Sequence, residues 1–179
     1  CNAVTCDNYQ ASYNAIKALI QKGHTNIGYI YSSRNYELST GRDRFQGYLD
    51  ALADSGLARD EKIIVGREQQ TFENGYDAMK QLLQEKKATA CFVAENPMAQ
   101  GVFKCLMDYK KRIPEEMAMI CYDDFEWSQL TVPTISAIRQ PMKEMGRKAA
   151  ELLLKKIGDP DVQCENIVLK SEFILRESC

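Results

Sequence analysis

The 179-residue sequence predicts one α/β domain built on an open, parallel, doubly wound sheet. Short apolar runs of about five residues alternate with amphipathic segments of about 12–16 residues, which is the pattern of βαβ units and of parallel strands. The length suits about one domain. With 45% hydrophobic and 27% charged residues, the chain can bury an ordinary core.

The alternating elements follow one another from the N-terminus to residue 122. Apolar runs predict strands at 27–31, 62–66, 90–94 and 117–122. Helices are predicted from Asp7–Asn8 to Gly23, at 45–53, at 76–83, and from the N-cap Asn96 with Pro97 to Tyr109. After Tyr122 the pattern changes to an extended 135–139, a helix at 142–157 and a terminal strand at 167–175.

Charge and cysteine content exclude several classes of function. The formal net charge is −2, and no basic run exceeds Lys110–Arg112, so this chain has little electrostatic support for binding nucleic acid by itself. No apolar stretch is long enough to cross a membrane. The seven cysteines form no C-x-x-C pair, and Cys91 and Cys121 lie in apolar runs, which favours reduced thiols in a cytoplasmic protein. With His24 as the one histidine, we expect no metal site.

Polar residues follow the predicted parallel strands, where ligands of open α/β sheets bind. They are Ser32, Ser33 and Arg34, then Arg67, then Glu95 and Asn96, then Asp123 and Asp124, with Arg42 and Arg44 opening the helix after the first strand. Carboxylates, amides and guanidinium groups on one rim suit a small polar molecule. Each residue also has a structural explanation: the aspartates could cap a turn, the arginines could be solvated, and Phe72 could be a satellite of the core.

Enzyme signatures are mostly absent. The chain has no G-x-S-x-G elbow, P-loop or G-x-G-x-x-G, and His24 lies at the opposite end of its strand from the rim. Hydrolysis by Glu95 with Asp123 is geometrically conceivable but lacks any supporting motif. We therefore expect a binding protein without catalytic residues or a cofactor.

A set of short motifs in a fixed order resembles a known family. The motifs are Val4–Asn8, Leu19–His24 with Asn26–Gly28, Arg44–Tyr48, Gly75–Tyr76, Ala94–Gly101, Ile113–Glu116, Tyr122–Asp124, Pro133–Ile135, Arg139–Met142 with Gly146, and Ile174–Cys179. Together they resemble the effector-binding domain of the lactose-repressor and galactose-repressor (LacI/GalR) transcriptional regulators, which is similar to periplasmic sugar-binding proteins (the periplasmic binding protein-like I fold). The resemblance covers nearly the whole chain.

The resemblance implies a cleft between two lobes that holds a sugar or purine-like effector and controls operator binding by a distant helix-turn-helix. It implies ligand contacts by Arg44, Phe72, Glu95, Asn96 and Asp123. The family usually has Asn-Asp at the Glu95–Asn96 position, and Phe72 lies at a slightly different spacing from the following glycine, so the effector cannot be copied from the family.

The resemblance also implies how the chain is organised. Residues 4–138 and 165–179 are expected to form the C-terminal lobe, 139–164 a helical segment of an otherwise absent N-terminal lobe, and the DNA-binding helix-turn-helix to lie outside this chain. The apolar stripe of the 142–157 helix then has no partner within the chain, and we expect it to dock on another copy or in a non-native place. A homodimer is expected through the helices around 74–84 and 97–109.

The alternative function is a periplasmic sugar-binding protein that serves a transporter. The reading frame upstream of Cys1 separates the two, because a basic helix-turn-helix segment supports the regulator and a signal peptide supports the transporter component.

Overall fold

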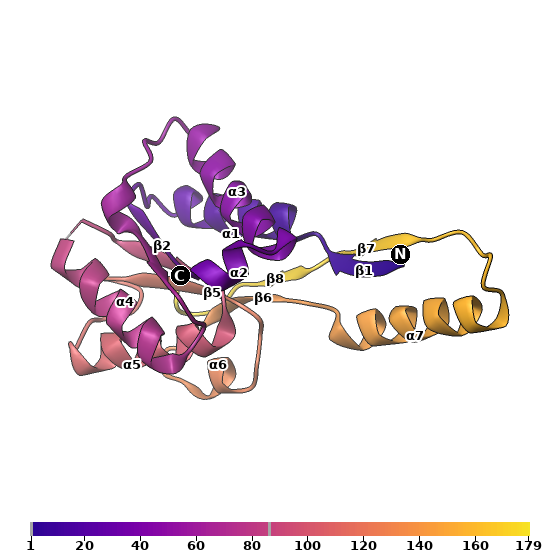
Figure 1. The fold of residues 1–179 in the computed structure, drawn as a ribbon. Coiled ribbons are helices and arrows are strands. Elements are labelled where there is room, and N and C mark those ends of the chain that lie inside the picture. The colour runs from indigo at the N-terminus through magenta and orange to yellow at the C-terminus, as the bar shows by residue number, and fades with distance from the viewer. Residues whose placement is uncertain (1, 86) are drawn as a thin grey trace.

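The computed structural model describes residues 2–85 and 87–179, which form a layered main body and a slender arm (Figure 1). The main body holds a six-stranded sheet of order β3-β2-β4-β5-β6-β8. All neighbouring pairs are parallel except β6 and β8 at one edge. The predicted open, parallel, doubly wound α/β fold is therefore confirmed.

The elements of the main body are α1 (Asn8–Gln21), β2 (Ile27–Ser32), α2 (Ser33–Tyr36), α3 (Ser39–Ala53), a 3-10 turn (Glu61–Ile63), β3 (Ile64–Arg67), α4 (Phe72–Glu85), β4 (Ala90–Val93), α5 (Asn96–Asp108), β5 (Ala118–Tyr122), α6 (Trp127–Leu130), β6 (Ser136–Arg139) and β8 (Glu172–Ile174). The arm consists of β1 (Ala3–Cys6), α7 (Met142–Gly158) and β7 (Asn166–Leu169).

The central strands β2, β4 and β5 are buried on both faces, and their side chains alternate between two cores. In β4, Cys91 and Val93 pack with α4 and α5, whereas Ala90 and Phe92 pack with α1 and α3. Successive side chains of a strand point to opposite faces of the sheet. Because helices cover both faces of this parallel sheet, every residue of the strand is apolar. Burial raises the pKa of the Cys91 thiol to about 12, so this cysteine is an inert part of the core.

Helices α4 and α5 touch through their backbones at two glycines. A Cβ on Gly101 would lie 1.9 Å from the carbonyl oxygen of Phe72, and one on Gly75 would lie 2.1 Å from that of Met98. Only glycine permits this approach, so these two positions fix how closely the helices pack.

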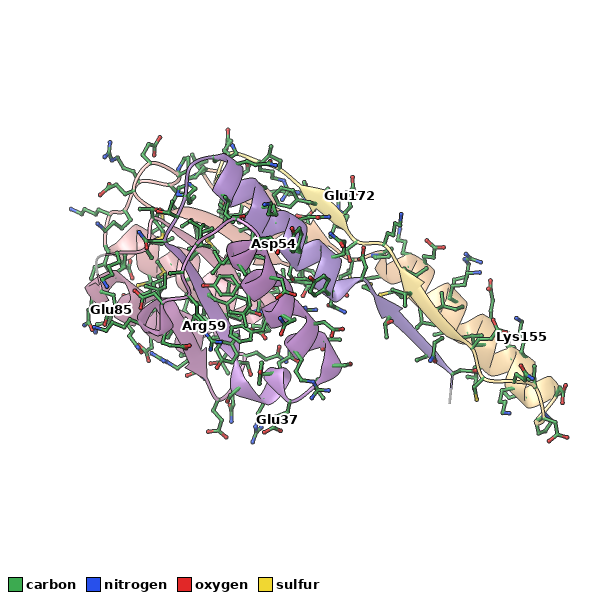
Figure 2. All side chains as sticks on the ribbon, turned by 90° about the horizontal axis from the view of Figure 1, so that it is seen from above. Glu37, Asp54, Arg59, Glu85, Lys155 and Glu172 are labelled. Atoms are coloured by element: carbon green, nitrogen blue, oxygen red, sulfur yellow. The ribbon has the colours of Figure 1, made fainter. Side chains whose placement is uncertain are left out.

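The arm stands away from the main body, and Lys155 marks its far half in Figure 2. Strand β1 pairs in parallel with β7, and α7 packs against β1. Leu152 is only 4% exposed, and its carbonyl oxygen accepts a hydrogen bond from Asn2 Nδ2. The expectation that the stripe of α7 has no partner within the chain was therefore wrong, because β1 covers part of it. Leu153, Leu154 and Ile157 remain exposed.

The terminal strand predicted at 167–175 is two strands. Between β7 and β8, the backbone N–H of Ser171 donates to the side chain of Asp7, with its nitrogen 2.7 Å from Oδ1, and not to a neighbouring strand. The first half then pairs with β1 and the second half with β6. Residues 4–6 and 166–169, expected in the same lobe as the sheet, thus lie in the arm with α7.

Other boundaries shift by a few residues. The helix predicted from residue 45 begins at Ser39, and β3 begins at Ile64 because Asp60 accepts a hydrogen bond from the N–H of Lys62 and closes a 3-10 turn. Helix α5 begins at Asn96 with Glu95 as its N-cap, one residue earlier than expected. Within the described ranges, the structure contains no helix with the length and apolar character of a membrane span.

Candidate functional site

The carboxyl ends of four adjacent parallel strands form one rim of the sheet. The residues that follow them are Ser33 after β2, Ala94 and Glu95 after β4, Asp123 after β5, and Gln140 after β6. Parallel pairing places these ends side by side, so residues distant in the sequence become neighbours.

Arg44 of α3 lies buried at this rim, with 6% of its surface exposed. Its Nη1 donates to the carbonyl oxygen of Ala94 at 2.6 Å, and its Nε donates to Asn8 Oδ1 at 3.0 Å. The guanidinium carbon lies 3.5 Å from the centre of the Tyr122 ring, which is cation–π geometry. The planar guanidinium is thus fixed on both its edge and its face.

Glu95 is 3% exposed, and the protein occupies both of its carboxylate oxygens. Oε2 accepts from the N–H of Ser32 at 3.1 Å, and Oε1 accepts from Asn35 Nδ2 at 3.1 Å. Burial raises the pKa of Glu95 to about 7, although these two hydrogen bonds and the nearby Arg44 oppose the shift. The side chain therefore holds the short helix α2 against the rim.

Asp123 occupies the turn after β5 with φ +72°, a left-handed conformation that aspartate and asparagine adopt more readily than most residues. Its Oδ1 accepts a hydrogen bond from Gln140 Nε2, and its carbonyl oxygen accepts from Asn96 Nδ2 at 3.4 Å. Asn96 Oδ1 in turn accepts from Gln100 Nε2 at 3.2 Å. The structure thus brings Arg44, Asn96 and Asp123 to one rim.

Asp124 has a structural role. Its buried carboxylate pairs with Arg176 and Arg139 and accepts a hydrogen bond from Ser128. Burial alone would raise the pKa of Asp124, but these partners lower it to about 2. The turn-and-pairing explanation therefore applies to Asp124, and Asp123 is the aspartate of the rim.

Phe72 is the predicted site residue that these hydrogen bonds do not include. It is the first residue of α4 and is 42% exposed. A polar groove of about 350 Å³ lies beside the partners of Glu95, and Gln70 and Thr71 line it instead of Phe72. The full lining is Ser32, Arg34, Asn35, Leu38, Gln69, Gln70 and Thr71.

Two rim residues were missed from the sequence, Asn8 and Gln140. Gln140 follows β6 directly, so the strand-end rule could have found it had β6 been counted among the parallel strands. Asn8 is the first residue of α1 and follows none of the predicted parallel strands, so the strand-end rule gives no signal for it. Arg42 is exposed and donates to the carbonyl oxygen of Glu37, and His24 contacts Thr89 before β4, away from the rim.

Comparison with known proteins identifies the family. Residues 16–179 match the model of the periplasmic binding protein-like domain. The chain is 35% identical over 167 residues to the ribose operon repressor of Haemophilus influenzae, covering 93% of this chain and 49% of that protein. It is 32% identical to catabolite control protein A of Priestia megaterium, covering 98% and 53%. The chain thus spans about half the length of these curated relatives.

Two solved structures share the fold over nearly the whole chain. A complex of the transcriptional regulator CelR with cellobiose matches with a TM-score of 0.91 at 30% identity, covering 99% of this chain and 54% of that one. A LacI family regulator from Enterococcus faecium with bound ribose also has a TM-score of 0.91, at 29% identity, covering 99% and 65%.

These relatives are transcriptional regulators and not enzymes, as the sequence predicted. The chain belongs to the periplasmic binding protein-like family, as an effector-binding domain of the LacI/GalR transcriptional regulators.

Proposed function

We propose that this chain senses a small polar metabolite, a sugar or a nucleobase, and thereby controls operator binding by a helix-turn-helix in the cytoplasmic regulator of which it is part. The observation that carries the proposal is the rim itself, where Arg44 and Asp123 are held by hydrogen bonds at neighbouring strand ends. One group donates hydrogen bonds and the other accepts them. Such a pair fits a ligand with both hydroxyl or N–H donors and oxygen or nitrogen acceptors.

Direct ligand contacts are proposed for Arg44, Asn96 and Asp123. The described residues accept hydrogen bonds from Nε and Nη1 of Arg44, which leaves its Nη2 group for a ligand. Asp123 presents its carboxylate at the same rim, where Oδ1 accepts from Gln140 Nε2. Glu95 is proposed to shape the site through α2, since both of its oxygens are engaged.

Phe72 is proposed as the stacking surface for a sugar or base. It follows the groove residue Thr71 directly, and its ring is exposed. The groove is lined mainly by amides and hydroxyls, with the cation Arg34 and no carboxylate, a lining that favours a polyhydroxylated ligand without positive charge. Ribose in one similar regulator and cellobiose in another are ligands of this kind.

A homodimer is proposed through α4, α5 and the adjoining α6. Trp127 of α6 packs against Phe103 of α5 with ring centres 6.2 Å apart, which joins the helices into one surface. Beyond it, Leu130 and Val132 are 81% and 88% exposed. Apolar side chains this exposed at the end of a helical layer suit burial by a second copy.

The test of effector binding is a thermal-shift screen of the protein against D-ribose, cellobiose, sugar phosphates and purine bases. A ligand at about 100 times its dissociation constant stabilises the folded state by about 2.7 kcal/mol. Asp123→Asn should reduce this stabilisation while keeping the left-handed turn, whereas Asp159→Asn on the arm should leave it unchanged. An effector whose shift is the same with Asp123→Asn does not bind at this carboxylate.

A further inference from the structure

Three segments of the chain connect the main body to the arm, and the rim residues Arg44 and Asp123 are each hydrogen-bonded to one of them. The connections are Cys6–Asn8 between β1 and α1, Arg139–Met142 between β6 and α7, and Leu169–Glu172 between β7 and β8. Figure 1 shows them side by side where the arm leaves the body. Any change at the rim that moves one of these segments also acts on the arm.

Asp123 is bonded to the connection between β6 and α7. Its Oδ1 accepts from Gln140 Nε2, and its backbone N–H donates to the carbonyl oxygen of Ile138 at 2.9 Å. Gln140 lies two residues before α7, and its carbonyl oxygen accepts from the N–H of Met142 at 2.9 Å. One side chain therefore separates the rim carboxylate from the first turn of the arm helix.

Arg44 is bonded to the connection between β1 and α1. Its Nε donates to Asn8 Oδ1, and Asn8 Nδ2 donates to the carbonyl oxygen of Cys6, the last residue of β1, at 3.1 Å. The adjacent Asp7 accepts from the N–H of Ser171 and donates its own N–H to Leu169 at 3.0 Å, which ties the third connection to the first. The three connections are thus fixed to the rim and to one another.

We propose that Gln140 is a positioning residue that couples effector binding to the arm, because an effector hydroxyl or N–H competes with its amide for Asp123. The inference rests on the proposed role of Asp123 as an effector acceptor. An effector donor that takes Oδ1 releases Gln140, and the connection into α7 loses its side-chain bond to the rim. Occupancy of the rim is then converted into a change in how firmly the arm is held.

The experiment measures backbone amide hydrogen exchange of α7 and of the β1–β7 ladder in this chain. Gln140→Glu places a carboxylate against Asp123 and breaks the bond. Asp123→Asn alone keeps an oxygen acceptor for Gln140. The double variant Asp123→Asn with Gln140→Glu restores a bond of opposite direction, because the asparagine amide can donate to the new carboxylate. Gln163→Glu adds the same charge to an exposed position of the arm as a control.

We expect exchange in the arm to be at least about 10-fold faster with Gln140→Glu, and close to wild type in the double variant and with Gln163→Glu. Rescue by the double variant isolates the hydrogen bond from any other structural role of Gln140. Unchanged exchange with Gln140→Glu, absence of rescue, or an arm already unprotected in the wild type would each overturn the proposal. Failure of the proposed function is a separate result, namely an effector thermal shift, with D-ribose or cellobiose as the probe, that Asp123→Asn leaves intact.

Discussion

Glu95→Gln should make the protein more stable than the wild type at neutral and alkaline pH. The folded protein raises the pKa of Glu95 from 4.5 to about 7, because the carboxyl group is buried. A raised carboxyl pKa means that the folded state holds its proton more tightly than the unfolded state. Stability from this group is therefore fully present below pH 4.5, declines as the pH rises towards 7, and is constant above that.

The size of the effect follows from the shift. The pKa of Glu95 rises from 4.5 to about 7, and each pKa unit is worth about 1.36 kcal/mol. Complete ionisation of Glu95 therefore lowers the free energy of unfolding by about 3 kcal/mol. Glutamine does not ionise, and it can still accept from the N–H of Ser32 while the Asn35 amide turns to accept from it. The difference in free energy of unfolding between Glu95→Gln and the wild type should therefore increase in favour of the variant by about 2–3 kcal/mol as the pH rises from 5 to 8.

Urea unfolding of both proteins at pH 5, 6, 7 and 8, followed by circular dichroism, measures this difference. The comparison cancels the titration of every other group, and Glu115→Gln at an exposed position is the matched control. A stability difference that stays constant across this range, or that shrinks as the pH rises, would refute the argument that burial governs Glu95.

Three further predictions concern packing, an ion pair and association. Gly101→Ala should destabilise the fold by about 2 kcal/mol or more in urea unfolding, because its Cβ would meet backbone at 1.9 Å, whereas Gly146→Ala in open space on α7 should be neutral or stabilising by up to about 1 kcal/mol. A larger loss at Gly146 than at Gly101 would contradict this account of helix packing. Asp124→Asn should cost about 3–5 kcal/mol at pH 7, because it removes the buried carboxylate that pairs with Arg176, whose side chain is only 13% exposed. Since the folded-state pKa of Asp124 is lowered to about 2, the wild-type advantage should be present above pH 4 and fade as the pH falls towards 2, and an advantage that persists at pH 2 would exclude the pairing as its source. Val132→Glu should convert a dimer into monomers in sedimentation velocity, whereas Leu154→Glu on the arm should not, and a dimer that survives Val132→Glu does not form through this surface.

The sheet could be predicted from the sequence because its signals are local. Runs such as 90–94 and 117–122 are continuously apolar, and amphipathic segments of helical length separate them, which leaves little alternative to a doubly wound parallel sheet. The same rule that locates ligands at strand ends placed Arg44, Asn96 and Asp123 on one rim, and the structure brings them together there.

The features that could not be predicted from the sequence depend on contacts between distant parts of the chain. At the break in the terminal strand, Ser171 donates its N–H to Asp7, which lies 164 residues away in the sequence. The engagement of Glu95 by Ser32 and Asn35 likewise joins the ends of two different strands. The short helices α2 and α6 have too few residues to show a period, so only tertiary packing defines them.

The pairing of β1 with β7 has a consequence for biosynthesis. Ala3 is matched to Asn166, so β1 cannot pair with β7 until that residue has been made. Strands β2 to β6 are complete by Arg139 and can form a parallel sheet first. The arm can therefore assemble only after these strands have been made, shortly before β8 completes the edge of the sheet, and a translational pause before Asn166 would prolong the time in which β1 lacks its partner β7.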